Sequence, residues 1–126
     1  MNLAIEIENI TKTYPGVLAN SDVSISVNSG SIHAIVGENG AGKSTLMKIL
    51  YGMVKPDSGS IQIFESKANM SSPKDAINLG IGMVHQHFML AKNLTVLENI
   101  ILGIDKPLLK NIKLSKYKSE IKKEMD

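Results

Sequence analysis

The fold is decided by Gly37-Glu38-Asn39-Gly40-Ala41-Gly42-Lys43-Ser44-Thr45. This stretch matches G-x-x-x-x-G-K-[ST], the pattern of a loop that binds phosphate groups. Because glycine has no Cβ atom, such a loop can curl around an anion and point successive backbone N–H groups at it. Lys43 is expected to reach the β- and γ-phosphates, and the Ser44 hydroxyl to bind Mg²⁺. We predict that all nine residues line a nucleotide site.

The segments on either side of this loop support the prediction. Residues 31–36, Ser-Ile-His-Ala-Ile-Val, predict a central strand directly before it. After it, Leu46, Ile49, Leu50 and Met53 follow the i, i+3, i+4, i+7 spacing of a helix with one buried face, expected over residues 43–51 with Gly52 just beyond its end. The alternative is an ordinary glycine turn. Strand, glycine loop and helix in this order predict an α/β fold of the P-loop type.

Composition limits the function classes. The chain has 126 residues, enough for one small domain, and a formal net charge of +2, too small to indicate nucleic-acid binding. All 14 basic residues are lysines, so this chain offers no arginine finger. It has no cysteine and no apolar run near the ~18 residues of a membrane span, so we expect neither thiolate metal sites nor a span of its own.

For the rest of the chain, the sequence predicts short strands and helices separated by turns. Alternating apolar and polar residues or apolar runs predict strands at 3–8, 23–27, 60–65 and 81–86. Proline, glycine and asparagine predict turns at 11–16, 28–30 and 55–59. Ser72 is expected to cap a short helix that Gly80 ends, and Thr95 and Glu98 form a capping box for a helix that runs to Leu102.

Composition changes after residue 104. Residues 105–126 hold seven of the lysines, and Tyr117, Ile121 and Met125 fall at i, i+4, i+8, which fits an amphipathic helix. The segment fits a solvated helix, a tail or the opening of a subdomain, and we favour the last. We therefore divide the chain into residues 1–104, a nucleotide-binding part, and residues 105–126, the start of a helical subdomain.

Several stretches taken together resemble one family. The sequence GENGAGKSTLMKIL at 37–50 is similar to the P-loop and first helix of the ATP-binding subunit of ABC transporters. Further similar stretches lie at 11–16, 55–61, 82–86 and 94–100, so the resemblance covers about residues 3–103. Residues 71–90, SSPKDAINLGIGMVHQHFML, look most like importers of nucleosides and simple sugars.

The resemblance implies a fold and a site. The fold is a partial P-loop ATPase core beside an antiparallel β subdomain, and the cofactors are ATP and Mg²⁺. Tyr14 would stack on the adenine, although by itself it also fits a plain surface tyrosine. Gln86 would reach Mg²⁺ and the attacking water, and would share the catalytic role with Lys43. His85 and His87 flank it; a metal site at these two residues is the weaker alternative.

The resemblance also implies partners. These are transmembrane permease subunits and a second ATP-binding domain, either as a dimer or as a fused half. The chain would lie in the cytoplasm, peripheral to the inner face of the cell membrane. Residues 88–93 correspond to the segment that docks on the permease, and a buried loop is the alternative. Nucleic acid is not an expected partner.

Parts of the family pattern do not occur in this sequence. It has no LSGGQ-like signature, no apolar strand that ends in Asp-Glu to hold Mg²⁺ and polarise water, and no late switch histidine. We therefore expect an N-terminal part of such a subunit: the family hydrolyses ATP, whereas this chain binds it without turnover. The alternatives are a non-catalytic fragment that binds nucleotide or docks on a permease, and a soluble P-loop ATPase or kinase.

Overall fold

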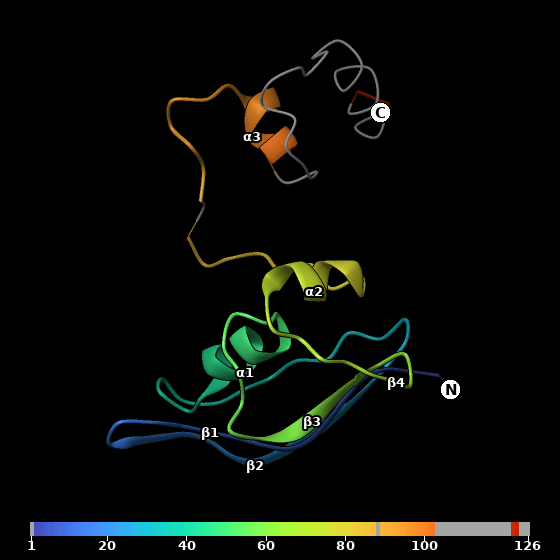
Figure 1. The fold of residues 1–126 in the computed structure, drawn as a ribbon, viewed down its shortest axis with the longest axis vertical. Helices are drawn as coiled ribbons and strands as arrows, with labels where there is room; N and C mark the ends of the chain where they lie inside the picture. Colours follow the sequence, from blue (N-terminus) through green and yellow to red (C-terminus); the bar gives the residue numbers. More distant parts are fainter. Residues whose placement is uncertain (1, 88, 103–121, 124–126) are drawn as a thin grey trace. The chain divides into compact units, whose positions relative to one another are not determined.

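The computed structural model describes residues 2–87, 89–102 and 122–123. They fall into two units, Met1–Val84 and His85–Asp126, each described here by itself. The first unit contains β1 (Leu3–Tyr14), β2 (Val17–Asn28), α1 (Lys43–Leu50), β3 (Ser58–Ile63), β4 (Ser66–Lys67) and α2 (Pro73–Asn78). The second contains α3 (Val96–Leu102), and Figure 1 shows the elements in chain order. No helix within the described residues is long and apolar enough to cross a membrane.

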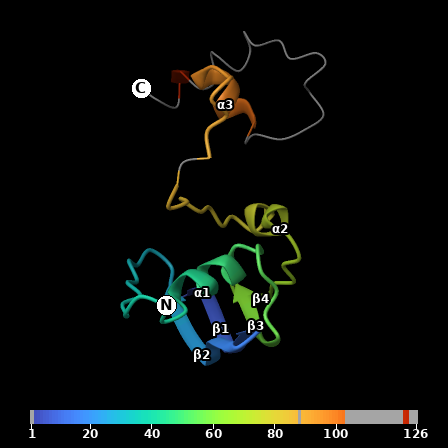
Figure 2. The same ribbon diagram turned by 90° about the vertical axis from the view of Figure 1, so that its left-hand side faces the viewer.

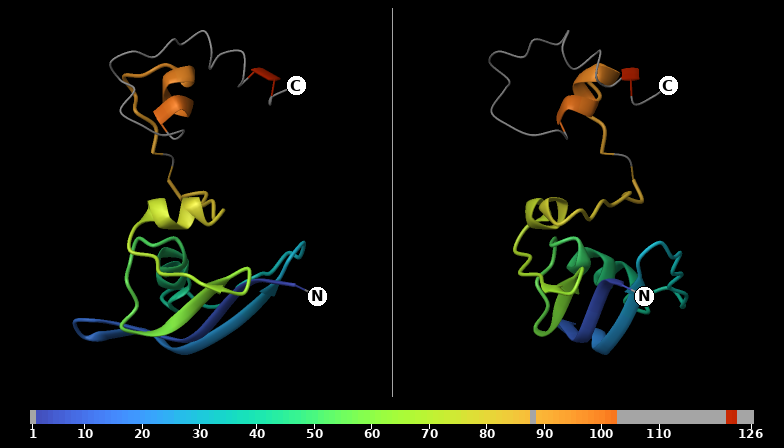
Figure 3. Two further views of the ribbon diagram at one scale, coloured as in Figure 1. Left: turned by 45° about the vertical axis from the view of Figure 1, so that its right-hand side comes forward. Right: turned by 90° about the vertical axis from the view of Figure 1, so that its right-hand side faces the viewer.

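The sheet of the first unit is antiparallel, in the order β2-β1-β3-β4. β1 and β2 form a long hairpin that Figure 3 shows from the side. Its loop is the two residues Pro15 and Gly16, because Tyr14 already pairs with Val17. The prediction of antiparallel pairing is confirmed, but the predicted turn at 11–16 was too long: residues 11–14 continue β1.

The core lies between one face of this sheet and α1. Leu46 and Ile49 of α1 are buried against four isoleucines of β1 and β3, namely Ile7, Ile10, Ile61 and Ile63. Figure 2 shows α1 lying across this face of the sheet. The predicted helix period is therefore confirmed for Leu46 and Ile49. Met53 was expected on the same buried face, but it follows the end of the helix and is exposed.

A bulge in β1 changes which residues face the core. Ile7 is buried, and the next fully buried residue of β1 is Ile10, a step of three residues instead of two. The pairing with β2 shifts between these residues, and Asn9 has a φ of 52°. On β2, Asp22 also has a positive φ, 51°, and its Oδ1 accepts a hydrogen bond from Asn9 Nδ2 at 2.7 Å. An extra residue in one strand turns every later side chain to the other face.

The predicted strands at 31–36 and 81–86 do not form, and these two predictions were wrong. Both segments are irregular in the structure, and Val36 and Val84 are each 91% exposed. An apolar strand of this kind becomes stable when neighbouring strands on both sides accept hydrogen bonds from its N–H groups and donate to its C=O groups. In the part of the chain that the structure describes, the paired strands all belong to the antiparallel sheet, which does not include either segment. Consequently the turn at 28–30 forms without a second strand after it.

The β3 strand is displaced from its prediction. Ile61 and Ile63 face the core and Phe64 is exposed, as the alternation indicates. However, β3 begins at Ser58 and ends at Ile63, whereas residues 60–65 were predicted. Phe64 and Glu65 have positive φ values of 46° and 63° and form the turn to β4. This conformation is unusual for side chains with a Cβ, which is why the sequence pattern gave no sign of a turn here.

The helix starts of α2 and α3 lie where the capping signals predicted, but the expected side-chain cap forms only at α3. Ser72 is the residue before α2 and Pro73 is its first residue. The Ser72 hydroxyl donates to the Asp75 carboxylate at 3.0 Å rather than capping a backbone N–H. Before α3, the Thr95 N–H and hydroxyl both donate to Glu98 Oε2, and the Glu98 N–H donates to Thr95 Oγ1. These two bonds from Thr95 hold the pKa of Glu98 below its ordinary value.

Two predictions lie outside the described residues. The division between residues 104 and 105 falls there. The helix expected over 105–126 also falls there, except that residues 122 and 123 are helical.

Gly59 provides a test of how β3 approaches β1. Its φ is 97°, and a Cβ atom on it would lie 2.6 Å from the backbone oxygens of Glu8 and Asn9. We expect Gly59→Ala to lower the free energy of unfolding by about 2–4 kcal/mol, from backbone strain and overlap together. Gly80→Ala is the matched control, because Gly80 has a similar φ of 84° with no atom within 4 Å. Urea unfolding of both variants measures the difference; equal losses would show that the close approach does not matter.

Candidate phosphate-binding site

The glycine-rich loop ends at the N-terminus of α1. Gly42 is the N-cap residue, with φ 86° and ψ 0°. The N–H groups of the first helical turn, which begins at Lys43, have no helix carbonyl to bond, and the helix dipole adds positive potential at this end. This local structure follows from the motif, and a helix N-terminus of this kind offers N–H groups that an anion can bind.

The Lys43 side chain folds over the loop. Its Nζ donates hydrogen bonds to the backbone oxygens of Gly37 and Glu38, both at 2.6 Å. The loop is closed further by the Ala41 N–H, which donates to Glu38 O at 3.2 Å. The ammonium group is thus held at the loop by two neutral acceptors, which a phosphate oxygen can replace with a stronger, charge-assisted bond.

β2 contacts the glycine-rich loop at Gly42. A Cβ atom at Gly42 would overlap the backbone oxygen of Ala19 and would lie 2.8 Å from Asn20 Nδ2. Asn20 is buried, 5% exposed, and its Nδ2 donates to Gly42 O at 3.2 Å. No motif in the sequence singles out Asn20. Its position on the core face depends on the bulge at Asp22, which no pattern in the sequence indicates.

Tyr14 and the loop line the same cavity. The cavity has a volume of about 290 Å³. Its walls come from β1, β2, the glycine-rich loop and the start of α1: Tyr14, Val17, Ala19, Asn39, Gly40, Ala41, Gly42, Lys43, Ser44 and Thr45. Tyr14 is 38% exposed. Gly37 and Glu38 were predicted to line the site but are not among these lining residues; their backbone oxygens accept hydrogen bonds from Lys43, which is a lining residue. The structure therefore brings Tyr14 and residues 39–45 of the glycine-rich loop to one cavity.

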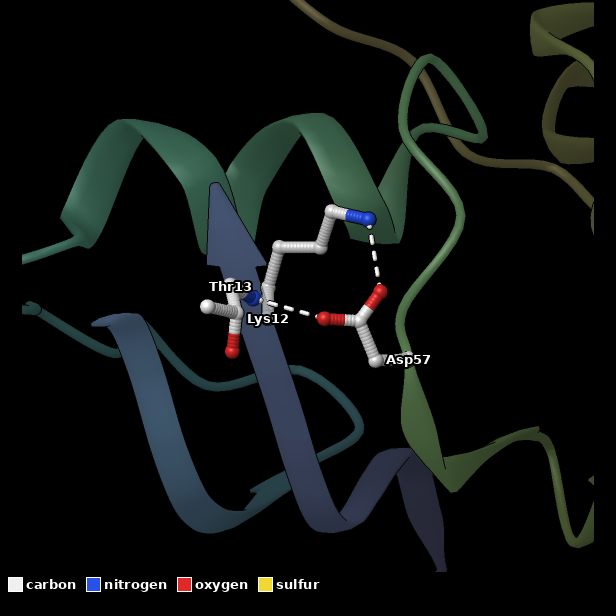
Figure 4. Close-up of polar contacts among 3 residues, drawn as sticks. All are labelled: Lys12, Thr13 and Asp57. Carbon is white, nitrogen blue, oxygen red and sulfur yellow. Dashed lines mark hydrogen bonds and ion pairs between the residues drawn. The ribbon is translucent and has the colours of Figure 1, made fainter. Parts of the chain in front are cut away.

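Asp57 joins β3 to the end of β1 (Figure 4). One carboxylate oxygen, Oδ1, lies 2.8 Å from Lys12 Nζ, and the other accepts a hydrogen bond from the Thr13 N–H at 2.7 Å. The bond from Lys12, followed by the bond from Thr13, holds the pKa of the Asp57 carboxyl below its ordinary value of 3.8. Lys12 Nζ also lies 5.6 Å from the centroid of the Tyr14 ring. The sequence pattern at 55–59 predicted only a turn for Asp57, and it carries no signal for this contact.

Gln86 belongs to the second unit. Its side chain is exposed, as is that of His87, and His85 is half-buried. Phe88, the first residue of the predicted docking segment, lies outside the described residues, whereas Met89 and Leu90 are exposed. Among the residues that the structure describes, no three His, Cys, Asp or Glu side chains are grouped so that they could hold a metal ion. The roles predicted for Gln86 remain predictions.

Gly42 is the position at which a side chain should damage the site most. Because a Cβ atom there would meet the Ala19 carbonyl and the Asn20 amide, we expect Gly42→Ala to lower the free energy of unfolding by about 2–4 kcal/mol. Gly40→Ala is the control: Gly40 has a similar φ, 83°, but open space around it, so only the strain of about 1–2 kcal/mol applies. Urea unfolding without ligand gives both values, and a loss no larger at Gly42 than at Gly40 would contradict the contact with β2.

Comparison with known proteins agrees with this geometry. A family model described as ABC transporter matches residues 20–126. The glucose import ATP-binding protein TsgD13 of Haloferax volcanii is 54% identical over 103 residues, which is 82% of this chain and 19% of that protein. The guanosine import ATP-binding protein NupO of Bacillus subtilis is 53% identical over 103 residues, 82% of this chain and 20% of that protein. The chain therefore spans about a fifth of the length of these curated relatives.

Solved structures give the same result. A nucleotide-free ATP-binding cassette from an ABC transporter superposes with a TM-score of 0.74 at 32% identity, over 89% of this chain and 47% of that one. Another cassette, solved in its ADP conformation, has a TM-score of 0.74 at 34% identity, over 90% of this chain and 47% of that one. The residues that the family model matches include the glycine-rich loop at 37–45, and the chain belongs to the ABC transporter family.

Proposed function

We propose that this chain binds ATP, with the phosphates in the loop at 37–45 and the adenine against Tyr14. The observation that supports this most is the shared cavity: Tyr14 on β1 and the loop before α1 are far apart in sequence, yet they line one space. A nucleotide requires this combination, because an aromatic ring binds the flat base and backbone N–H groups bind the charged end. ABC ATPases generally bind ATP with Mg²⁺, and the residues present fit that ligand.

The proposal assigns separate roles to the N–H groups of the first helical turn, to Lys43 and to Ser44. The first-turn N–H groups of α1 hold phosphate oxygens, and the Lys43 ammonium exchanges its bonds to Gly37 O and Glu38 O for phosphate contacts. Ser44 offers its hydroxyl to Mg²⁺. When it is bound, Mg²⁺ neutralises part of the negative charge of the phosphates.

For the longer protein, we propose ATP hydrolysis coupled to import of nucleosides or simple sugars. This proposal is supported by two relatives, which are named as a glucose import and a guanosine import ATP-binding protein. Its partners would be transmembrane permease subunits and a second ATP-binding domain, at the cytoplasmic face of the cell membrane. This chain by itself would bind ATP without turnover, since its sequence has no Asp-Glu pair after an apolar strand to hold the metal and polarise water.

Thermal unfolding with and without Mg-ATP tests the binding proposal. A ligand that binds only the folded state at 100 times its Kd adds about 2.7 kcal/mol of stability, so the unfolding midpoint should rise by several degrees. Lys43→Ala should remove most of this rise. Lys48→Ala is the control, because Lys48 is an exposed lysine of the same helix.

A midpoint that does not respond to Mg-ATP, or that responds equally in wild type and Lys43→Ala, would overturn the proposal. The same preparations should show no Mg²⁺-dependent phosphate release. If the wild type released phosphate and Lys43→Ala did not, the proposal of ATP binding would still hold. The expectation that this chain does not hydrolyse ATP would be wrong.

The role of Tyr14 is tested by comparing two ligands. Stacking of a base on an aromatic side chain is worth about 1–3 kcal/mol by alanine substitution. Tyr14→Ala should therefore weaken ATP binding by about tenfold or more while leaving the affinity for inorganic triphosphate unchanged. Tyr14→Phe keeps the ring and should bind both ligands like the wild type. Equal weakening of both ligands by Tyr14→Ala, measured by isothermal titration calorimetry, would show that Tyr14 does not recognise the base.

A further inference from the structure

We propose that Lys12 and Asp57 are positioning residues for the base end of the site: together they hold the Tyr14 ring in the orientation that stacks on a purine. This inference rests on the proposed function, because it assumes that Tyr14 receives the base. It assigns a role to two residues that lie outside the phosphate-binding motif, one on β1 and one directly before β3.

Lys12 is unusual in its burial. Its side chain is 16% exposed, although lysines are rarely buried to this degree without a partner. The bulge at Asn9 explains its direction, since it places residues 10, 12 and 14 on the face of the sheet that α1 covers. Lys12 and Tyr14 are therefore neighbours on one face, and the Lys12 ammonium lies 5.6 Å from the centroid of the Tyr14 ring. That distance is within the range of a cation–π contact.

Asp57 fixes both the ammonium and the backbone beside it. Its Oδ1 holds Lys12 Nζ at 2.8 Å, and its Oδ2 accepts the Thr13 N–H at 2.7 Å. Its own N–H donates to Thr11 O at 2.9 Å. Figure 4 shows the two carboxylate oxygens pointing at Lys12 and at Thr13. These three bonds attach residues 11–13 to the segment that enters β3, so the backbone is held up to the residue before Tyr14.

The geometry favours a positioning role over a stabilising one. Asp57 is 44% exposed, and ion pairs at such exposed positions contribute little to stability. An ammonium over one face of the Tyr14 ring, in contrast, fixes the plane of the ring and leaves its other face for the base. A ring whose orientation is set before binding loses less rotational freedom when the base stacks on it.

The test compares ATP with inorganic triphosphate, using the whole chain. Lys12→Met keeps the length of the side chain and removes its charge. We expect ATP to bind about three- to tenfold more weakly and triphosphate to bind as in the wild type. Lys12→Arg should recover most of the ATP affinity, because guanidinium also pairs with carboxylate and with a ring face. Lys48→Met removes the charge of an exposed lysine on α1 and should change neither ligand.

Two further variants separate a positioning role from other roles. Asp57→Asn should weaken ATP binding in the same selective way, since it releases the Lys12 ammonium. In a Tyr14→Ala background, Lys12→Met should cause no additional loss, because Lys12 acts through the ring. Circular dichroism of each variant confirms that it is folded, and Asp57→Asn tests the same contact if Lys12→Met does not fold.

The possible outcomes are distinct. Unchanged ATP affinity in Lys12→Met and Asp57→Asn would overturn the inference. So would an equal loss for ATP and triphosphate, which would make Lys12 a phosphate contact, or a further loss in the Tyr14→Ala background. Failure of the proposed function looks different: wild-type protein would bind neither ATP nor triphosphate, or Lys43→Ala would bind both normally.

Discussion

The contact between α1 and the sheet is the interaction on which the site depends. Leu46 and Ile49 bury one face of a helix of only eight residues, and a helix this short is not stable alone in water. The same contact brings Gly42 against the backbone of Ala19, where a side chain would not fit. Without this packing, the N–H groups of the first turn would have no fixed direction, and the glycine-rich loop would remain a flexible segment.

The bulge at Asn9 is a second feature on which the site depends, because it sets the face of the sheet to which Lys12 and Tyr14 belong. Strand residues alternate between faces, so one additional residue decides whether Tyr14 points at the loop or away from it. The bond between Asn9 and Asp22 keeps the bulge in place on both strands. The side chains of Lys12 and Tyr14 then reach the face that carries α1. The geometry of the base end thus depends on a backbone irregularity several residues away from it.

Local signals in the sequence predicted local structure well. The helix after the loop, the start of α2 at Pro73 and the capping box at Thr95 and Glu98 form as expected, because each depends on neighbours within a few residues. The Ser72 side chain, in contrast, does not cap α2. The two apolar segments at 31–36 and 81–86 were predicted as strands and are irregular. A strand needs hydrogen-bond partners from elsewhere in the chain, and composition alone does not say whether they are present.

The amino-acid sequence by itself determined the phosphate-binding loop, its helix and the family, since a glycine-rich turn followed by Lys43 and an apolar helical stripe has few other uses. The family resemblance suggested Tyr14 as a further member of the site, but only the tertiary structure decided how side chains outside the loop are placed around it. Tyr14 reaches the cavity, Asn20 supports Gly42, and Asp57 holds Lys12. The reason is physical: these contacts join residues that are distant in the chain, and their directions follow from strand register and bulges, which arise when strands pair.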